Sequence, residues 1–183
     1  DQFVFLPIQS IALAVTTFVG QNLGAGNVSR AKKGTYCSYA MATIVSVVLI
    51  VPIMLFSGDV AKIFNSNPDI VAHASLLLKY MTPFYLFSCV NQVFAAAMRG
   101  AGNSTAPMLI MLGCFIGVRQ IYLYVVSTFV TNEFLPIAFS YPVGWAACTV
   151  AILFYYFVVF RFDKNKLLDA NKNNIAENAP EQK

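Results

Sequence analysis

Hydrophobic residues fill five long stretches of this chain, and short polar segments separate them. The stretches cover residues 3–20, 35–56, 76–98, 107–130 and 136–160. A helix needs about 20 largely apolar residues to cross a bilayer. The pattern therefore predicts an all-α, polytopic membrane protein, in which five transmembrane helices form one bundle over residues 1–160.

The last segment, residues 161–183, has a different composition. It is rich in Asn and Lys and contains few apolar residues. Such a segment cannot bury enough apolar surface to fold alone. We expect a polar, disordered tail.

Charged residues alternate with the spans and predict their direction. Basic residues occupy one set of connections and the tail, at Arg30, Lys32, Lys33, Arg99, Arg161, Lys164 and Lys166. The other side carries four acidic residues, Asp1, Asp59, Asp69 and Glu133, against Lys62 and the interfacial Lys79. Cytoplasmic loops of membrane proteins carry the excess of Lys and Arg. The sequence thus predicts a multi-pass protein of the plasma (inner) membrane, in contact with the lipid bilayer, with a cytosolic C-terminus. A start outside the membrane without a signal peptide also suggests a fragment that lacks an odd number of spans.

The composition excludes several classes of function. Hydrophobic residues make up 58% of the chain and charged residues 11%, against about 25% charged residues in soluble domains. The net charge is +4, but the basic residues lie between the spans and do not cluster on one surface. We therefore expect no nucleic-acid partner. One histidine and four cysteines without a Cys-x-x-Cys pair predict no metal site, no cofactor and four small buried cysteines. An enzyme would need a nucleophile with a base, or metal ligands, at membrane depth. With one histidine and no Asp or Glu in the apolar stretches, we do not expect an enzyme.

Two glycine-rich turns follow the first and third spans. The first is Gln-Asn-Leu-Gly-Ala-Gly-Asn and the second is Arg-Gly-Ala-Gly-Asn-Ser-Thr-Ala-Pro. Glycines allow helix ends with positive φ and close backbone approach, and Ser104 or Thr105 could cap the helix that contains Pro107. The residues of interest are Gln21, Gly24, Gly26, Arg99, Gly100, Gly102 and Pro107.

These two turns, separated by two spans and on the same side, resemble the multidrug and toxic compound extrusion (MATE) transporters. The resemblance implies twelve spans in two halves, of which this chain would cover spans eight to twelve, with the N-terminal half as its partner. It implies a Na⁺- or H⁺-coupled antiporter that exports amphipathic, often cationic drugs by alternating access. A lipid-linked oligosaccharide flippase of related architecture and a non-transporting membrane scaffold are the alternatives. No Asp or Glu lies in the five stretches, so we expect the coupling-ion site in the missing part.

Polar and aromatic residues in two spans are candidates for a substrate cavity. Tyr80, Phe84, Ser88 and Asn91 share one face of the third span, which either lines a cavity or packs against another helix. In the first span, Gln9 and Thr16, together with Thr17, either contact substrate or form interhelical hydrogen bonds.

Arg119 is the charge that lies well inside an apolar stretch. An intramembrane charge costs about 2.5 kcal/mol or more, so it needs a partner or water. Backbone carbonyls with Gln120, or a group in the missing half, could supply that partner. We expect structural anchoring rather than substrate contact. Tyr141 and Trp145 are interpreted as packing or interfacial aromatics.

Overall fold

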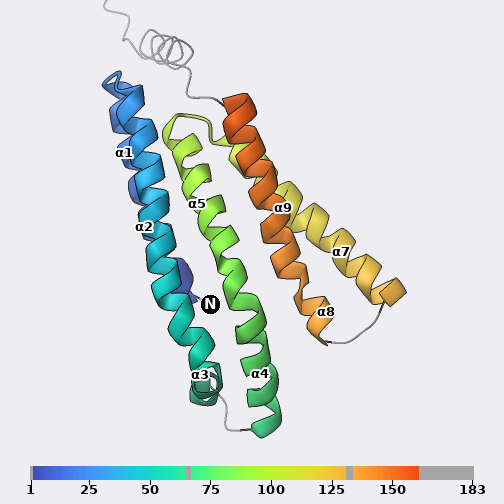
Figure 1. Cartoon of the computed structure of the whole chain (residues 1–183). Coiled ribbons are helices and arrows are strands. Elements are labelled where there is room, and N and C mark those ends of the chain that lie inside the picture. Colours follow the sequence, from blue (N-terminus) through green and yellow to red (C-terminus); the bar gives the residue numbers. More distant parts are fainter. Residues whose placement is uncertain (1, 65–66, 131–133, 161–183) are drawn as a thin grey trace, which may run out of the picture.

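The computed structural model describes residues 2–64, 67–130 and 134–160, and every element within them is a helix (Figure 1). The elements are α1 (Gln2–Gly24), α2 (Val28–Leu55), α3 (Ser57–Phe64), α4 (Pro68–Met81), the 3₁₀ turn η1 (Thr82–Phe84), α5 (Tyr85–Gly100), α6 (Thr105–Leu112), η2 (Gly113–Val118), α7 (Arg119–Val125), η3 (Val126–Val130), α8 (Phe134–Ala138), α9 (Ser140–Phe154) and η4 (Tyr155–Phe160), where η2, η3 and η4 are π-helical. The predicted tail, Asp1 and Glu133 lie outside the described residues.

Five helical rods are long and apolar enough to cross a membrane, which confirms the predicted fold class. They are Phe3–Gly24, Val28–Leu55, Pro68–Gly100, Thr105–Thr128 and Pro136–Phe160. Three of them start before the apolar stretch from which they were predicted, because the polar residues that flank the hydrocarbon are helical as well. The third rod changes to 3₁₀ geometry at Pro83, a residue that cannot donate a backbone hydrogen bond.

The connection between the second and third spans is also largely helical. Helix α3 covers its first part, and α4 begins at Pro68. The side-chain oxygen of Asn67 accepts a hydrogen bond from the Asp69 N–H at 3.0 Å, and Pro68 occupies the first helical position. Both features stabilise a helix start, so α4 begins eight residues before the apolar stretch.

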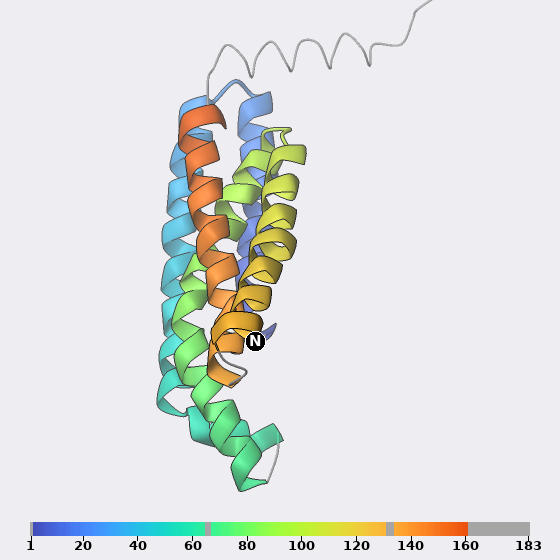
Figure 2. The ribbon, with the colours of Figure 1, turned by 90° about the vertical axis from the view of Figure 1, so that its right-hand side faces the viewer.

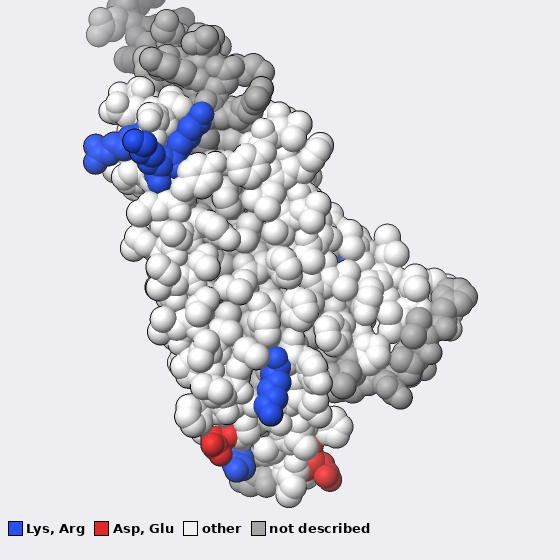
Figure 3. Space-filling view, viewed as in Figure 1, with Lys and Arg blue, Asp and Glu red and all other residues white. Residues whose placement is uncertain are grey.

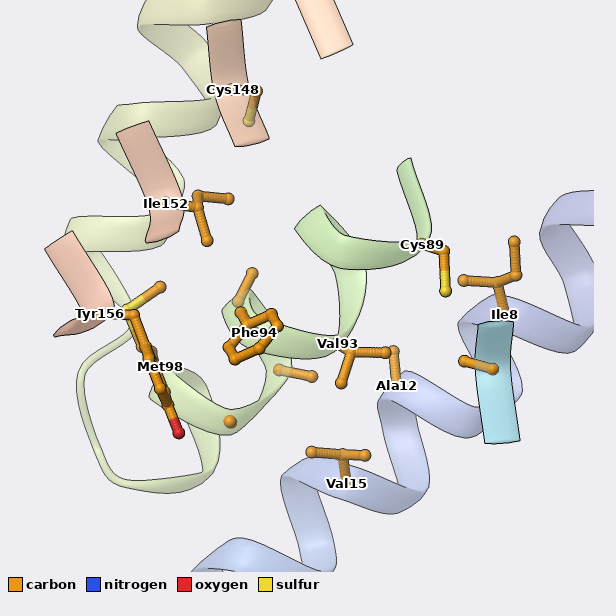
Figure 4. Packing of buried hydrophobic residues seen from close by; sticks show 14 of the residues in the cluster. Ile8, Ala12, Val15, Cys89, Val93, Phe94, Met98, Cys148, Ile152 and Tyr156 are labelled. Atoms are coloured by element: carbon orange, nitrogen blue, oxygen red, sulfur yellow. The ribbon is translucent and has the colours of Figure 1, made fainter. Parts of the chain in front are cut away.

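Helix α5 lies at the centre of the bundle, between the α1–α2 pair and α9 (Figures 1 and 2). Its residues 93–98 are buried at six consecutive positions, which requires neighbours on all sides of the helix. In Figure 4, Cys89 and Val93 lie toward Ile8 and the other α1 residues, while Phe94 lies on the side of α9. The central helix therefore connects the two outer groups of helices.

The backbones of α1 and α5 approach each other closely where Thr16 meets Gly100. A Cβ atom at Gly100 would lie 2.4 Å from the Thr16 carbonyl oxygen, and one at Gly20 would lie 3.2 Å from the Gly100 carbonyl oxygen. The Thr16 hydroxyl lies 3.2 Å from the carbonyl oxygen of Ala96 and 3.1 Å from that of Ala12. Small residues and hydroxyl bonds of this kind hold membrane helices together. We refer to this contact as the Thr16–Gly100 crossing.

Charged residues gather at the two ends of the bundle (Figure 3). Arg30, Lys32 and Lys33 lie in the first turns of α2, and Arg99 lies in the last turn of α5. Asp59 and Asp69 lie in the first turns of α3 and α4, at the opposite end. We call the first of these the basic end. Its position agrees with the alternation of charges along the sequence.

The Thr16–Gly100 crossing predicts a specific effect of one added methyl group. In the full-length protein, Gly100→Ala should lower the free energy of unfolding by about 1–3 kcal/mol, as overpacking does in other tightly packed cores. Thermal unfolding in detergent measures the effect. Gly113→Ala is the matched control, because a Cβ atom there meets nothing within 4 Å. Equal unfolding temperatures for the two variants would contradict the close approach.

Candidate functional site

The face of α1 that no other described helix covers is mixed, because Phe3, Leu6 and Leu13 are exposed on it together with polar side chains. Gln9, Ser10 and Thr17 are exposed, whereas Val15 and Val19 are buried. The hydroxyls of Ser10 and Thr17 bond to carbonyl oxygens of their own helix, but the Gln9 amide needs a partner or water. An exposed amide in an apolar helix is typical of a helix that packs inside a bundle or lines a cavity.

The sequence grouped Gln9 with Thr16, but the structure gives the two residues different surroundings. Thr16 lies at the crossing, where Gly100 brings the backbone of α5 within hydrogen-bonding distance of its hydroxyl. Gln9 is exposed. For Thr16 the structure therefore agrees with the interhelical alternative, and Gln9 stays a cavity candidate.

The four cavity candidates of the third span also have different surroundings, and the two aromatic ones lie near Phe139. Tyr80 is half exposed, and its ring centroid lies 6.5 Å from that of Phe139. The Phe84 ring lies 6.1 Å from the same Phe139 ring. These two aromatic residues contact the segment just before α9, at the end of the bundle opposite the basic residues.

Asn91 joins α5 to α9 instead of standing free. Its amide donates to the Trp145 carbonyl oxygen at 3.2 Å. Its side-chain oxygen lies 2.9 Å from the Thr149 hydroxyl, which shares its proton between this oxygen and the Trp145 carbonyl oxygen at 2.8 Å. The residue is 1% exposed, and the neighbouring Ser88 is 6% exposed. Asn91 thus matches the packing alternative, because a buried amide without partners would be costly.

Arg119 contacts an aromatic ring. Its guanidinium carbon lies 3.8 Å from the centroid of the Tyr141 ring, a distance at which a cation–π interaction is strong. Within the described ranges no residue hydrogen-bonds to Arg119, and its buried Nε atom has no partner. Bonds to backbone carbonyls or to Gln120, which the sequence suggested, are therefore not made. The contact with Tyr141 escaped prediction because the two residues lie in different spans.

Further aromatic residues extend from Tyr141 across three helices. The Tyr141 and Trp145 rings are 6.2 Å apart, and Trp145 meets the edge of Tyr85 at 5.4 Å. Phe5 of α1 lies 5.1 Å from Tyr85 and 6.1 Å from Trp145. Sequence reasoning missed this group, because aromatic residues are frequent throughout the chain and only the fold selects those that meet. We call Phe5, Tyr85, Trp145 and Tyr141 the aromatic row.

The two glycine turns form the connections at the basic end. Gly26 and Gly102 have positive φ, at 74° and 87°, as the motifs predicted. Gly24 and Gly100 do not, which corrects that expectation for them, although Gly100 is required by close packing. Gln21 is exposed.

The predicted caps of the helix after the second turn are wrong. Neither Ser104 nor Thr105 caps α6; the side-chain oxygen of Asn103 accepts the N–H of Ala106 at 3.2 Å. The amide of Asn103 also donates to the Tyr155 hydroxyl at 3.1 Å, which ties the turn to the end of the last span. Pro107 is buried in the first turn of α6, where its missing N–H has no intrahelical partner to lose.

The Asn91–Thr149 bond predicts a measurable coupling. A double-mutant cycle of Asn91→Ala and Thr149→Val in the full-length protein should give an interaction free energy of about 0.5–1.5 kcal/mol, the range of interhelical hydrogen bonds in membranes. Unfolding by a denaturing detergent measures it. The exposed Thr128 supplies the control pair, in which Asn91→Ala is combined with Thr128→Val. A cycle that closes to zero would refute the packing role.

Comparisons with known proteins identify the family. The MatE family model matches residues 1–125. The chain is 28% identical to the probable multidrug resistance protein YoeA of Bacillus subtilis, over 87% of this chain and 34% of that protein. It is 32% identical to the probable multidrug resistance protein NorM of Pasteurella multocida, over 63% of this chain and 25% of that protein. The chain thus spans about a third or less of the length of these relatives.

The fold also has a counterpart among solved structures. An inward-facing structure of a multidrug resistance MATE family transporter of the MOP superfamily superposes with a TM-score of 0.76. The superposition covers 94% of this chain and 38% of that one, at 18% identity. The family model spans more than half of the chain, and the five apolar helices repeat the architecture of a known member. The chain therefore belongs to the MatE family and forms part of a multi-pass membrane protein.

Proposed function

We propose that the full-length protein, of which this chain forms part, is a secondary active exporter of amphipathic, often cationic organic compounds. The observation on which this rests is the exposed amide of Gln9 in the membrane-spanning helix α1, in a chain that belongs to the MatE family. An amide directed at lipid without a partner would be costly, so a water-filled substrate path is the better explanation for Gln9. The printed names of the relatives, multidrug resistance proteins, support the choice of substrate class.

The proposed transport cycle is alternating access driven by Na⁺ or H⁺. Two helical units that rock against each other around a central site would expose that site to each side in turn. The described part of the five spans contains one carboxylate, Asp69, in the first turn of α4. We therefore place the coupling-ion site in the part of the protein outside this chain.

The proposed orientation puts the basic end in the cytosol. Arg30, Lys32 and Lys33 there are exposed and Arg99 is partly buried. Such basic residues concentrate on the cytoplasmic side of membrane proteins. This places the N-terminus of α2 inside and α3 outside the plasma (inner) membrane.

Transport itself is tested with the full-length gene. Expression in a bacterial host that lacks its main efflux pumps should raise tolerance to ethidium and other organic cations. Inverted vesicles should exchange the dye for Na⁺ or H⁺, and collapse of both gradients should stop uptake. Unchanged tolerance together with absence of gradient-driven uptake would rule out the exporter.

Gln9 offers a sharper test of the substrate path. Gln9→Ala should change the KM for transported dye about three- to tenfold and leave the unfolding temperature unchanged, because the side chain is exposed. Thr17→Ala serves as a neighbour on the same face, and Thr16→Val as a control that should lower stability through loss of the Ala96 bond. Identical transport by wild type and Gln9→Ala would remove Gln9 from the path.

The orientation predicts which side of the membrane labels a cysteine. With the exposed Cys37 replaced by serine, Asp59→Cys should react with a membrane-impermeant maleimide in intact spheroplasts. Ser29→Cys should react only after the membrane is opened. The reverse pattern would invert the proposed topology.

A further inference from the structure

Arg119 is a cation deep in a membrane-spanning helix without a charged partner in the described ranges. It lies nine residues before the end of the rod Thr105–Thr128, which corresponds to about 14 Å of helix. The ion pair that the described residues form is Lys62 with Asp59, at the exposed end of the bundle. An unpaired charge at the depth of Arg119 is unfavourable. An anion next to the guanidinium would offset this cost.

The guanidinium has one described contact and unused donors. Tyr141 covers one face of the group at 3.8 Å. The Nε atom is fully buried and has no hydrogen-bond partner. The two terminal nitrogens of Arg119 are not fully buried in this way. No residue in the described ranges hydrogen-bonds to them, so both nitrogens keep some exposed surface and their N–H donors are not used by the described residues.

The chemistry of the site selects a carboxylate. A guanidinium fork matches the two oxygens of a carboxylate, and the resulting charge-assisted bonds are stronger than neutral ones. A single positive charge balances one negative charge, and neither the described part of Thr105–Thr128 nor that of Pro136–Phe160 contains a second cation. Tyr141 and the adjacent Trp145 provide an aromatic surface beside the fork.

We propose that Arg119 and Tyr141 form an intramembrane carboxylate-binding site. The carboxylate comes either from an amphipathic aromatic solute, whose rings would lie along the aromatic row, or from an Asp or Glu side chain in the part of the protein outside this chain. The first source rests on the proposed transport function. The second does not depend on it.

Binding of two matched dyes to the full-length protein in nanodiscs tests the first source. Rhodamine B carries a free carboxylate, and its ethyl ester lacks that charge on the same ring system. A solute site predicts about tenfold tighter binding of the acid, the equivalent of one charge-assisted hydrogen bond. Arg119→Met should abolish this preference and leave the ester unaffected, and Lys62→Met should keep the preference.

The sign of a stability change tests the second source. If a carboxylate of the protein pairs with Arg119, Arg119→Met leaves that carboxylate unpaired and lowers the unfolding temperature more than Tyr141→Leu does. An arginine without an anion predicts the opposite sign, because removal of an unpaired buried charge stabilises a protein.

The outcomes separate this inference from the proposed function. Tight binding of the ester without preference for the acid, together with a raised unfolding temperature for Arg119→Met, overturns the carboxylate site and leaves the exporter intact. Binding of neither dye, together with a lowered unfolding temperature for Arg119→Met, supports a carboxylate from the protein and counts against the exporter.

Discussion

The close backbone contact between α1 and α5 is the constraint on which the rest of the bundle depends. Gly100 admits the carbonyl oxygen of Thr16, and Gly20 faces the Gly100 carbonyl oxygen. In a membrane, apolar side chains gain little by leaving lipid, so close packing of small residues and hydrogen bonds must hold helices together. With α1 fixed against the central helix at this point, the inner and outer faces of α1 are determined along its length.

Polar side chains within the spans fall into two groups as a consequence. Thr16, Asn91 and Thr149 bond across helices and contribute to packing. Gln9 and Thr17 remain on the outer face of α1. The aromatic row and Arg119 form a third set, in which rings from three helices meet beside one charge. The distinction matters for function, because a group that is buried and bonded between helices cannot contact a solute.

The sequence was sufficient to predict the architecture, because span length, charge alternation and glycine position are local properties. Each of the five predicted apolar stretches corresponds to one of the five long helical rods. Gly26 and Gly102 adopt the positive φ that their turns require. The role of each polar residue was not predictable in this way. The spacing of Ser88 and Asn91 along the chain places them on one helix face, but it does not show whether that face meets lipid, a cavity or another helix. The position of α9 in the fold is what brings Thr149 to Asn91. Local capping also depended on geometry, since Asn103 rather than Ser104 reaches the start of α6.

The accessibility of single cysteines along α1 tests the central claim most directly. In the full-length protein with Cys37 replaced by serine, Gln9→Cys and Thr17→Cys should react readily with a small water-soluble, membrane-impermeant thiol reagent, applied from each side of the membrane in turn. Thr16→Cys should be protected, since its side chain lies against the backbone of α5. Reaction of Thr16→Cys at the rate of Gln9→Cys would contradict the Thr16–Gly100 crossing and the separation of packing residues from the exposed face.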